Sequence, residues 1–457
     1  MDELATRLMQ IDQIPQPAID LSRYRERISR FDPVRINGHV IQVVGLVIEA
    51  IGPSAMIGEL CRIAKSRHDT DPIYAEVVGF RDSRVLLMPI GEREGIKARN
   101  EVIALRTPHR VSVGPELLGR VLNGFGTPMD DKPMPRCSIQ YPVNASPPNS
   151  LRRNRITQSL AVGIRSIDGL LTIGKGQRMG IFAGSGVGKS TLLGMVARNT
   201  AADVNVIALT GERGREVRDF IEENLGEEGL KRSVVVVSTS DQPPILRLKS
   251  AMVATAIAEY FRDQGRDVML ILDSLTRLAT AQRDVGLAIG EPPATRGYTP
   301  SVFALLPRLL ERAGNSDRGS ITGLYSVLVD GDDMNEPVAD TARGILDGHI
   351  VLSRALANAG HYPAIDLLQS VSRVMNDVIS PQHQAAARTF RSILSVYREA
   401  EDLINIGAYV EGSNPIIDTA KRRIGDIRRF LQQTPDQNVN FSQTQQQLIS
   451  EFDNETV

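Results

Sequence analysis

Apolar runs that alternate with helix-like stretches, between about residues 160 and 380, constrain the fold of this chain more than any other feature. The runs are nearly continuous in apolar residues, and the stretches between them have helical character. Strands of this kind, joined through helices, form a parallel sheet that is covered by helices on both faces. We therefore expect an α/β domain with a parallel sheet. The runs are "RMGIFAG", "VNVIALT", "SVVVVST", "VMLILDS" and "ITGLYSVLV".

The sequence changes character on either side of this domain. Between about residues 36 and 106, short β-branched runs are separated by glycine and polar turns, which is typical of a small β-barrel. After about residue 381 the strand pattern ceases and helical stretches follow, although the glutamine-rich end has only a weak helical signal. We expect a barrel before the α/β domain and a helical region after it.

The composition argues against several classes of protein. The formal net charge is −1, so no overall basic field favours nucleic acid. The two cysteines, Cys61 and Cys137, make neither a disulfide framework nor a metal knuckle, and they suit a reducing compartment. No apolar stretch approaches the roughly 20 residues that cross a bilayer, and the acidic N-terminus is unlike a secretory signal. We expect a cytosolic protein that binds no nucleic acid.

The segment "AGSGVGKST" follows a predicted strand and opens a helix, which is the setting of a phosphate-binding P-loop. Its glycines let main-chain amides turn toward phosphate oxygens at the positive end of the helix. Lys189 would reach the β- and γ-phosphates, and Ser190 would offer its hydroxyl to Mg²⁺. The alternative is a glycine-rich turn without a ligand, and the strand–loop–helix context disfavours it. The predicted nucleotide-binding residues are Gly184, Ser185, Gly186, Val187, Gly188, Lys189, Ser190 and Thr191.

Asp273 ends the apolar strand "VMLILDS". An acid at the carboxyl end of a strand is often only a turn residue. With a P-loop in the same alternating pattern, it is better interpreted as a residue that holds Mg²⁺ through the water shell of the ion.

Glu212 stands in "GERGREVRDF", directly after the apolar run that ends at Thr210. In an open parallel sheet, ligands bind beyond the carboxyl ends of the strands, so Glu212 is expected near the P-loop. A solvated glutamate has a pKa of about 4.3, and it would be an anion that orients and polarises an attacking water. Arg213 would steady this glutamate or contact the phosphates. A solvated turn remains the alternative, above all for Arg215 and Arg218.

These motifs together resemble a known family. "AGSGVGKST", "GERGREV", "LILDSLTR" and "GPELLGRVLNGFGTPMD" are similar to the catalytic-subunit relatives of rotary ATP synthases. Within that superfamily, residues 329–378 closely resemble the flagellar type III export ATPases, mainly through "GDDMNEPVAD". The resemblance implies ATP as substrate, and together with the helical spacing of apolar residues near the N-terminus it divides the chain into four regions. These are an N-terminal amphipathic, partner-docking helix at 1–30, a β-barrel at 31–110, a RecA-like ATPase domain at 111–380 and a C-terminal helical domain at 381–457.

The resemblance also implies roles for individual residues. Glu212 matches the catalytic glutamate of the family, and Arg213 matches the phosphate-side arginine beside it. Asp273 matches the Mg²⁺-side aspartate, and Arg277 the active-site arginine that follows. Tyr362 falls where the synthase β-subunit places an adenine-stacking tyrosine, although a packed loop aromatic is the alternative.

Arg373, in "SVSRV", aligns with the arginine that one synthase subunit inserts into the site of its neighbour. Such an arginine stabilises charge in the transition state, whereas a surface salt bridge is the alternative. One chain would thus carry both a water-positioning glutamate and a finger arginine. A homohexamer of identical subunits is therefore expected.

The resemblance implies partners and a location as well. The expected partners are a coiled-coil stalk protein in the ring, the export gate and chaperone–substrate complexes, with peripheral association at the cytoplasmic face of the inner membrane. Leu4, Leu8 and Ile11 put an apolar stripe on a short helix, which would bind a regulatory stator-like protein or the barrel of the chain itself. The segment "IGAYVEGSNPIID" replaces the acidic rotor loop of the synthases, which puts torque generation in doubt.

Three other functions compete with a flagellar ATPase that admits export substrates and releases chaperones. A virulence-type secretion ATPase would have the same chemistry and different cargo. A non-catalytic ring subunit would bind nucleotide without hydrolysis, and Glu212 argues against it. An RNA translocase shares the RecA core, but the near-neutral charge and the lack of aromatic–basic interleaving in the barrel region weigh against it.

Overall fold

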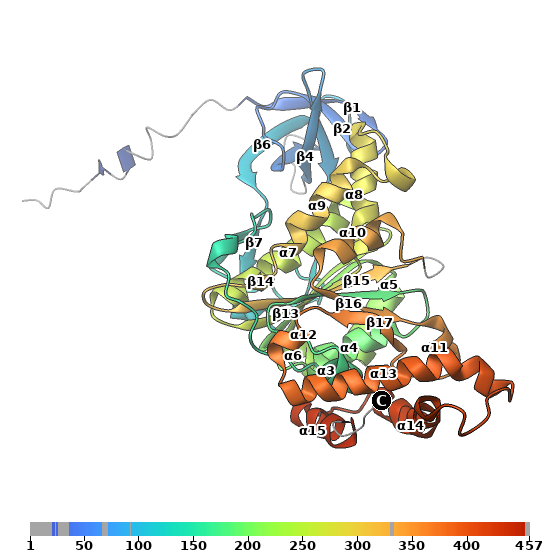
Figure 1. The fold of residues 1–457 in the computed structure, drawn as a ribbon. Helices are drawn as coiled ribbons and strands as arrows, with labels where there is room; N and C mark the ends of the chain where they lie inside the picture. The colour runs from blue at the N-terminus through green and yellow to red at the C-terminus, as the bar shows by residue number, and fades with distance from the viewer. Residues whose placement is uncertain are drawn as a thin grey trace, which may run out of the picture.

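The fold was analysed in a computed structural model of the chain, which describes residues 21–22, 24–25, 36–65, 72–91, 93–329 and 333–452. The predicted apolar stripe at Leu4, Leu8 and Ile11 lies outside these residues. The chain is elongated and has a β-barrel at one end, an α/β domain in the middle and a group of helices at the other end (Figure 1). This is the predicted fold class, and the order of its parts along the chain is confirmed.

Six antiparallel strands close the barrel in the order β1-β2-β5-β4-β3-β6. Alternate residues face its interior, where small and β-branched side chains such as Val40, Ile63 and Val77 form a core of their own. The strands are β1 (Gly38–Val44), β2 (Val47–Ile51), β3 (Glu59–Ala64), β4 (Ile73–Arg81), β5 (Arg84–Pro89) and β6 (Glu101–Pro108).

The central sheet has the strand order β17-β16-β10-β15-β13-β11-β12-β8, and β14 pairs with β15. The five predicted apolar runs form β10, β11, β12, β13 and β15, which are mutually parallel and almost entirely buried. The last strand, β17, is antiparallel to β16. The strands are β8 (Arg120–Asn123), β10 (Arg178–Ala183), β11 (Val204–Glu212), β12 (Ser233–Thr239), β13 (Asp267–Asp273), β14 (Gly314–Asn315), β15 (Ser320–Leu328), β16 (Gly348–Leu352) and β17 (Ile365–Ser372), and β7 (Arg110–Val113) pairs separately with β9 (Ile139–Pro142).

Helices cover both faces of this sheet and make two separate apolar cores. One face packs on α7 (Pro244–Asp263), α8 (Leu275–Ile289), α9 (Pro300–Leu310) and α10 (Pro337–Ile345). The other packs on α3 (Arg165–Leu170), α4 (Lys189–Asn199), α5 (Gly214–Asp219), the π-helical turn Phe220–Leu225 and α6 (Gly226–Lys231). Two short helices, α11 (Arg354–Asn358) and α12 (Met375–Val378), flank β17.

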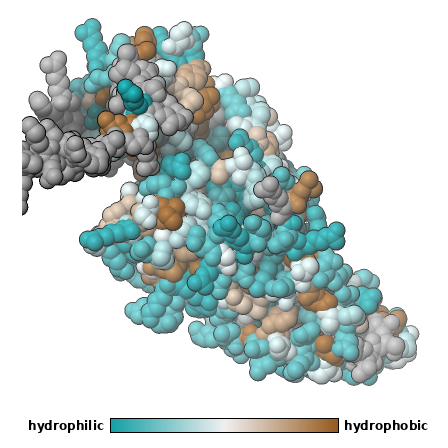
Figure 2. All heavy atoms as spheres, turned by 90° about the vertical axis from the view of Figure 1, so that its left-hand side faces the viewer, coloured by the Kyte–Doolittle hydropathy of each residue, from teal (hydrophilic) through white to brown (hydrophobic). Residues whose placement is uncertain are grey.

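The C-terminal helices extend the second of these cores. They are α13 (Pro381–Asn405), α14 (Pro415–Leu431) and α15 (Phe441–Phe452). The glutamine-rich end forms α15 because Thr444, Leu448 and Phe452, spaced four residues apart, are buried on one face. Within the described residues, every helix is too short or too polar to span a bilayer. On the face shown in Figure 2, apolar groups are scattered among hydrophilic ones.

A buried ion pair joins the barrel to the α/β domain. Lys249 of α7 lies 2.7 Å (Nζ to Oε2) from Glu76 of β4, and both side chains are almost fully buried. At the end of α8, Arg81 donates a hydrogen bond to the carbonyl oxygen of Ile289 at 2.7 Å. The barrel is therefore held on the two helices that cover one face of the sheet.

Candidate active site

Parallel pairing brings three functional segments to one edge of the sheet. In the strand register, Leu209 lies opposite Asp273, and Ala183 lies opposite Leu328. The P-loop after β10, the loop after β11 and the end of β13 therefore meet at the carboxyl edge, where ligands of such sheets bind. The P-loop, the residues around Glu212 and Arg277 of α8 line a pocket of about 440 Å³. Its lining is Ala183, Gly184, Ser185, Gly186, Gly188, Lys189, Ser190, Thr191, Glu212, Arg213, Glu216, Arg277, Leu328 and Val329.

The P-loop has the conformation that its glycines predict. Gly186 and Gly188 have φ angles of 77° and 89°, in the left-handed region that other residues avoid, and Gly188 caps α4. The side chain of Val187 is buried in the core, so only its main chain can face a ligand. Ser185 and Ser190 are exposed.

Lys189 and Asp273 form a buried ion pair in the floor of this pocket. The ammonium group of Lys189 also lies 3.8 Å from Oε1 of Glu212. The hydroxyl of Ser326, on β15, donates a hydrogen bond to Oδ1 of Asp273 at 2.6 Å. A cation, two carboxylates and a hydroxyl from four different strands and helices are thus brought together beside the P-loop.

Glu212 is buried, which differs from the expectation of a solvated carboxylate. Burial raises its pKa to about 7, and the nearby negative charge of Asp273 adds to the rise. The cations Lys189 and Arg277 oppose the rise, and Nε of Arg277 lies 3.5 Å from Oε1 of Glu212. The carboxyl group is therefore poised between its two protonation states near neutral pH.

Gly211 explains how Arg277 approaches Glu212 so closely. Gly211 has a φ angle of 72°, and a Cβ atom added there would lie 3.0 Å from Cδ of Arg277. Any larger residue would be strained and would press on the arginine. The hydroxyl of Ser274 accepts a hydrogen bond from the main-chain N–H of Arg277 and caps α8, which fixes the start of the helix that carries the arginine.

Arg213 and Tyr362 lie at the rim of the pocket. The side chain of Arg213 is 77% exposed and lies 3.7 Å from Glu216 of the same turn. Tyr362 is 45% exposed, and its ring covers Gly188, since a Cβ atom added to that glycine would lie 3.5 Å from two ring carbons. Both side chains are free to contact a bound molecule.

Arg373 lies at the opposite edge of the sheet from the P-loop. It follows β17, whose last residue, Ser372, pairs with Gly348 near the start of β10. Its side chain is exposed, and its guanidinium lies 3.5 Å from the carbonyl oxygen of Arg343. With a rise of about 3.3 Å per residue, the length of β10 separates it from the P-loop by roughly 15 Å. Of the predicted site residues, this one is not brought to the pocket of its own chain.

Sequence reasoning missed Ser326 and Glu216. No local signal marks Ser326, because it meets Asp273 only through the pairing of β13 with β15, in which Tyr325 lies opposite Leu272. Glu216 lies in the first turn of α5, and it lines the same pocket as Glu212. It stands within the quoted "GERGREV", so its place in that motif was the available signal.

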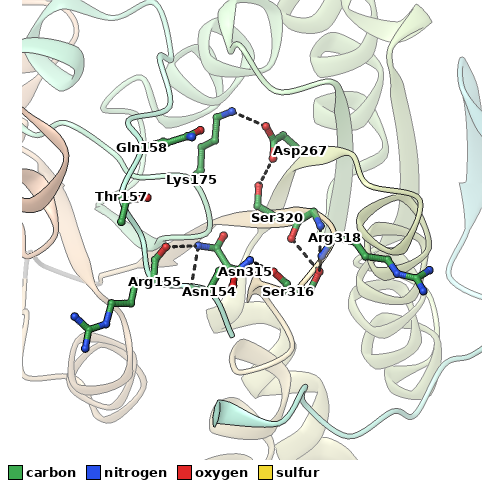
Figure 3. A pocket seen from close by; sticks show the side chains of 11 residues that line it. Asn154, Arg155, Thr157, Gln158, Lys175, Asp267, Asn315, Ser316, Arg318 and Ser320 are labelled. Atoms are coloured by element: carbon green, nitrogen blue, oxygen red, sulfur yellow. Dashed lines mark hydrogen bonds and ion pairs between the residues drawn. The ribbon is translucent and has the colours of Figure 1, made fainter. Parts of the chain in front are cut away.

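A second pocket, of about 290 Å³, lies at the amino edge of the sheet (Figure 3). Lys175 pairs with Asp267 at 2.6 Å, and Asp267 accepts a hydrogen bond from Ser320 at 2.7 Å. The side chains of Arg155 and Arg318 point away from the cavity (Figure 3). Its cations are thus paired or turned outward, unlike the converging groups beside the P-loop.

Family models cover most of the chain. Residues 163–372 match the nucleotide-binding domain of the ATP synthase alpha/beta family, and residues 40–106 match its beta-barrel domain. The flagellum-specific ATP synthase of Bacillus subtilis is 57% identical over 90% of this chain and 94% of that protein. The chain belongs to the ATP synthase alpha/beta family. Residues 379–450 match the C-terminal domain of the T3SS EscN ATPase, which agrees with the departure from the synthases at this end.

Other relatives of this alpha/beta family member come from both kinds of type III system. The flagellum-specific ATP synthase of Salmonella typhimurium is 50% identical over 90% of this chain and 93% of that protein. The type 3 secretion system ATPase of Sinorhizobium fredii is 49% identical over 94% of each. The assembled ATPase EscN of enteropathogenic E. coli superposes with a TM-score of 0.85 at 44% identity, over 90% of this chain and 99% of that chain. The chain is accordingly an ATPase of the type III group, with ATP as its substrate.

Glu212→Gln tests the buried carboxyl group through the stability of the nucleotide-free protein. The folded-state pKa of about 7 lies above the value of about 4.3 in an unfolded chain, so the fold favours the neutral form. This preference stabilises the folded state. The stabilisation is fully present below about pH 4 and is lost as the pH rises to about 7, at about 1.4 kcal/mol per pH unit. Because the amide never ionises, the Tm of Glu212→Gln relative to wild type should rise between about pH 5 and about pH 7 and then level off. A constant difference in Tm across this range would contradict the buried-carboxyl interpretation.

Proposed function

We propose that this ATPase serves the flagellar type III protein export apparatus, where it promotes the entry of export substrates and the release of their chaperones. The flagellum-specific relatives at 57%, 53% and 50% identity support the flagellar assignment. An injectisome role is the alternative, because type 3 secretion system ATPases reach 51% identity. The observation that carries the chemistry is the meeting of Lys189, Asp273 and Glu212 beside the P-loop.

In this proposal, each residue of the pocket has one task. The P-loop amides and Lys189 bind the phosphates of ATP, and Tyr362 stacks on the adenine. Glu212, when ionised, accepts a hydrogen bond from the attacking water and orients it, and the cations Lys189 and Arg277 favour that ionised form. Arg213, exposed at the rim, contacts the phosphate side of the nucleotide.

The site has the donors that Mg²⁺ requires. Ser190 offers an exposed hydroxyl in the first turn of α4, and Asp273 offers a carboxylate at the end of β13. No cluster of three or more acidic, histidine or cysteine ligands occurs in the described part of the chain. Mg²⁺ needs none, because it is usually bound by one or two protein oxygens together with phosphates and water. When bound, the ion neutralises charge on the phosphates.

Arg373 completes the site from a neighbouring subunit. It lies at the amino edge of the sheet while the P-loop lies at the carboxyl edge, so one chain presents the finger on one side and the pocket on the other. Head-to-tail contacts close into a ring when the rotation between neighbouring subunits closes, and this is the arrangement that we propose here. We therefore propose a homohexamer with one site at each subunit interface. The solved structure of assembled EscN supports assembly of this kind.

The first test separates binding from hydrolysis. Lys189→Ala should weaken ATP binding, because it removes a direct contact between a cation and the phosphates. Glu212→Gln should bind ATP nearly as well as wild type and lose most hydrolysis, because the water loses its anionic acceptor. Nucleotide binding and phosphate release measured on both variants check this. In a strain that lacks the gene, wild type should restore motility and flagellar export, whereas Glu212→Gln should not.

The outcomes discriminate between the candidate functions. A Glu212→Gln variant that hydrolyses ATP within a few-fold of wild type would refute the role of this residue. A wild-type protein without phosphate release would indicate a non-catalytic ring subunit, and stimulation of release by RNA would indicate a translocase. If effector secretion and not motility is lost in the deletion strain, the injectisome alternative holds.

The second test concerns the ring. Specific ATPase activity should rise with protein concentration, because subunits must assemble before Arg373 reaches a neighbouring site. Arg373→Ala should abolish this rise and leave nucleotide binding by the monomer intact, with a loss of rate of about 10³-fold or more. The matched control is Arg318→Ala, an exposed arginine at the same edge of the sheet, whose side chain points away from the second pocket of its own chain (Figure 3). Specific activity that stays constant on dilution to the monomer would rule out a shared site.

We also propose partners, a location and the four-part division of the chain given above. A central stalk is present in the solved complex of EscN with EscO, which superposes with a TM-score of 0.84 at 43% identity. By analogy we propose a coiled-coil stalk in the ring, contacts with the export gate and with chaperone–substrate complexes, and a cytoplasmic location with peripheral association at the inner membrane. The N-terminal segment would dock a regulatory stator-like protein.

Deletion of residues 1–18 tests this docking site. The stripe formed by Leu4, Leu8 and Ile11 would lie on a helix too short to be stable alone, so it needs a surface to cover it. Co-purification with the regulator should be lost on deletion, while the Tm and the basal ATPase activity stay unchanged. A pull-down unchanged by the deletion would place the docking site elsewhere, and a large drop in Tm would indicate that the helix packs on the barrel.

A further inference from the structure

Gln433 links its own segment, which follows α14, to the segments around Gly163 and Tyr362 through hydrogen bonds. It follows the end of α14, is only 5% exposed, and its main-chain N–H donates a hydrogen bond to the carbonyl oxygen of Tyr362 at 3.0 Å. Its side-chain amide donates to the carbonyl oxygens of Gly163 at 2.8 Å and Gln437 at 2.9 Å. Its side-chain oxygen accepts from the main-chain N–H of Arg165 at 3.0 Å.

These contacts fix the Gln433 side chain in one orientation. Both amide protons have carbonyl acceptors and the oxygen has an N–H donor, so the exchange of nitrogen and oxygen would set an oxygen against two carbonyl oxygens. The segment from Gly163 to Arg165 leads into α3, which is packed in the core between the sheet and the C-terminal helices. Gln433 is therefore anchored to a rigid part of the molecule, and its main chain holds the Tyr362 loop.

The Tyr362 loop matters because the Tyr362 ring covers Gly188 of the P-loop. An exposed ring keeps a single position only if its main chain is held, since one face of it must stay open to a ligand. We infer that Gln433 is a positioning residue that sets the place of Tyr362 over the P-loop and thereby the affinity for the base of the nucleotide. This inference rests on the adenine-stacking role of Tyr362 in the proposed function.

The adjacent Gln432 provides a matched control. Its side chain is exposed, and its carbonyl oxygen, which every substitution retains, accepts a hydrogen bond from Arg165 at 2.5 Å. Gln432→Ala and Gln433→Ala thus remove the same atoms one residue apart, and only the second removes the anchor. Gln433→Met keeps most of the volume without the polar atoms, and it serves if the alanine variant does not fold.

A tryptophan reporter reads the base contact directly. The chain has no tryptophan, so Tyr362→Trp gives a single signal that a stacked adenine quenches. In this background, Gln433→Ala should raise the Kd for Mg·ADP by about fivefold or more, which corresponds to the net free energy of about one of the three side-chain hydrogen bonds that it removes, and Gln432→Ala should leave the Kd unchanged. Inorganic triphosphate, a probe without a base, should compete with ADP for Lys189 and the P-loop with the same inhibition constant in all variants.

Three results would overturn the inference. One is an equal Kd for Mg·ADP in the Gln432→Ala and Gln433→Ala variants. Another is a parallel loss of triphosphate and ADP affinity, which would indicate general damage to the P-loop. If ADP does not quench Tyr362→Trp even with Gln433 present, Tyr362 does not contact the base, and that part of the proposed function fails together with the inference. The first result, with normal quenching by ADP, leaves the proposed function intact and removes the inference alone.

Discussion

The common direction of the central strands is the constraint on which the site depends. Because β10, β11 and β13 run parallel, the P-loop, Glu212 and Asp273 leave the sheet at the same edge. Each segment then needs only a short loop to reach the pocket. The same constraint sends the end of the antiparallel β17, with Arg373, to the other edge. A complete set of catalytic groups would then require two copies of the chain, with the pocket of one facing the Arg373 edge of the next.

Burial of the charged groups beside the P-loop costs free energy, and the ion pairs among them offset this cost. Lys189, Asp273 and Glu212 are all largely buried, and burial of ions without partners costs several kcal/mol each. With two carboxyls and one lysine at the floor, the lysine pairs with Asp273, and Glu212 has the raised pKa. Of the two carboxyl groups, Glu212 has the less favourable ionised form, and it is the one proposed to orient water. The ionisation of Glu212 would therefore change with the charge of any molecule that enters the pocket.

The sequence predicted the parts of the structure that local pattern determines. The five central strands, the P-loop turns and the barrel follow from continuous apolar runs, glycines at positive φ and short β-branched segments. What it did not predict depends on distant partners. The raised pKa of Glu212 depends on its burial in the folded chain and on the nearby charge of Asp273. Ser326 meets Asp273 only through the register of β15, and β8 joins the sheet edge from a segment rich in turn-forming residues. The α15 helix forms from a weak signal because a ready-made core covers its three buried residues.

Direct contacts connect the site to the barrel at one end of the molecule and to the C-terminal helices at the other. The barrel is fixed to α7 and α8 through the buried Lys249–Glu76 pair and the bond from Arg81 to the end of α8. The same α8 carries Arg277 at its beginning, 3.5 Å from Glu212. At the other end, Gln433 follows α14 and donates a main-chain hydrogen bond to the carbonyl oxygen of Tyr362. The barrel thus contacts the helix that carries Arg277, beside the carboxyl group proposed to orient water, and the C-terminal helices contact the loop of Tyr362, which is proposed to stack on the base. With these roles, movement of the C-terminal helices would change mainly the affinity for nucleotide. Movement of the barrel would change mainly the rate of hydrolysis.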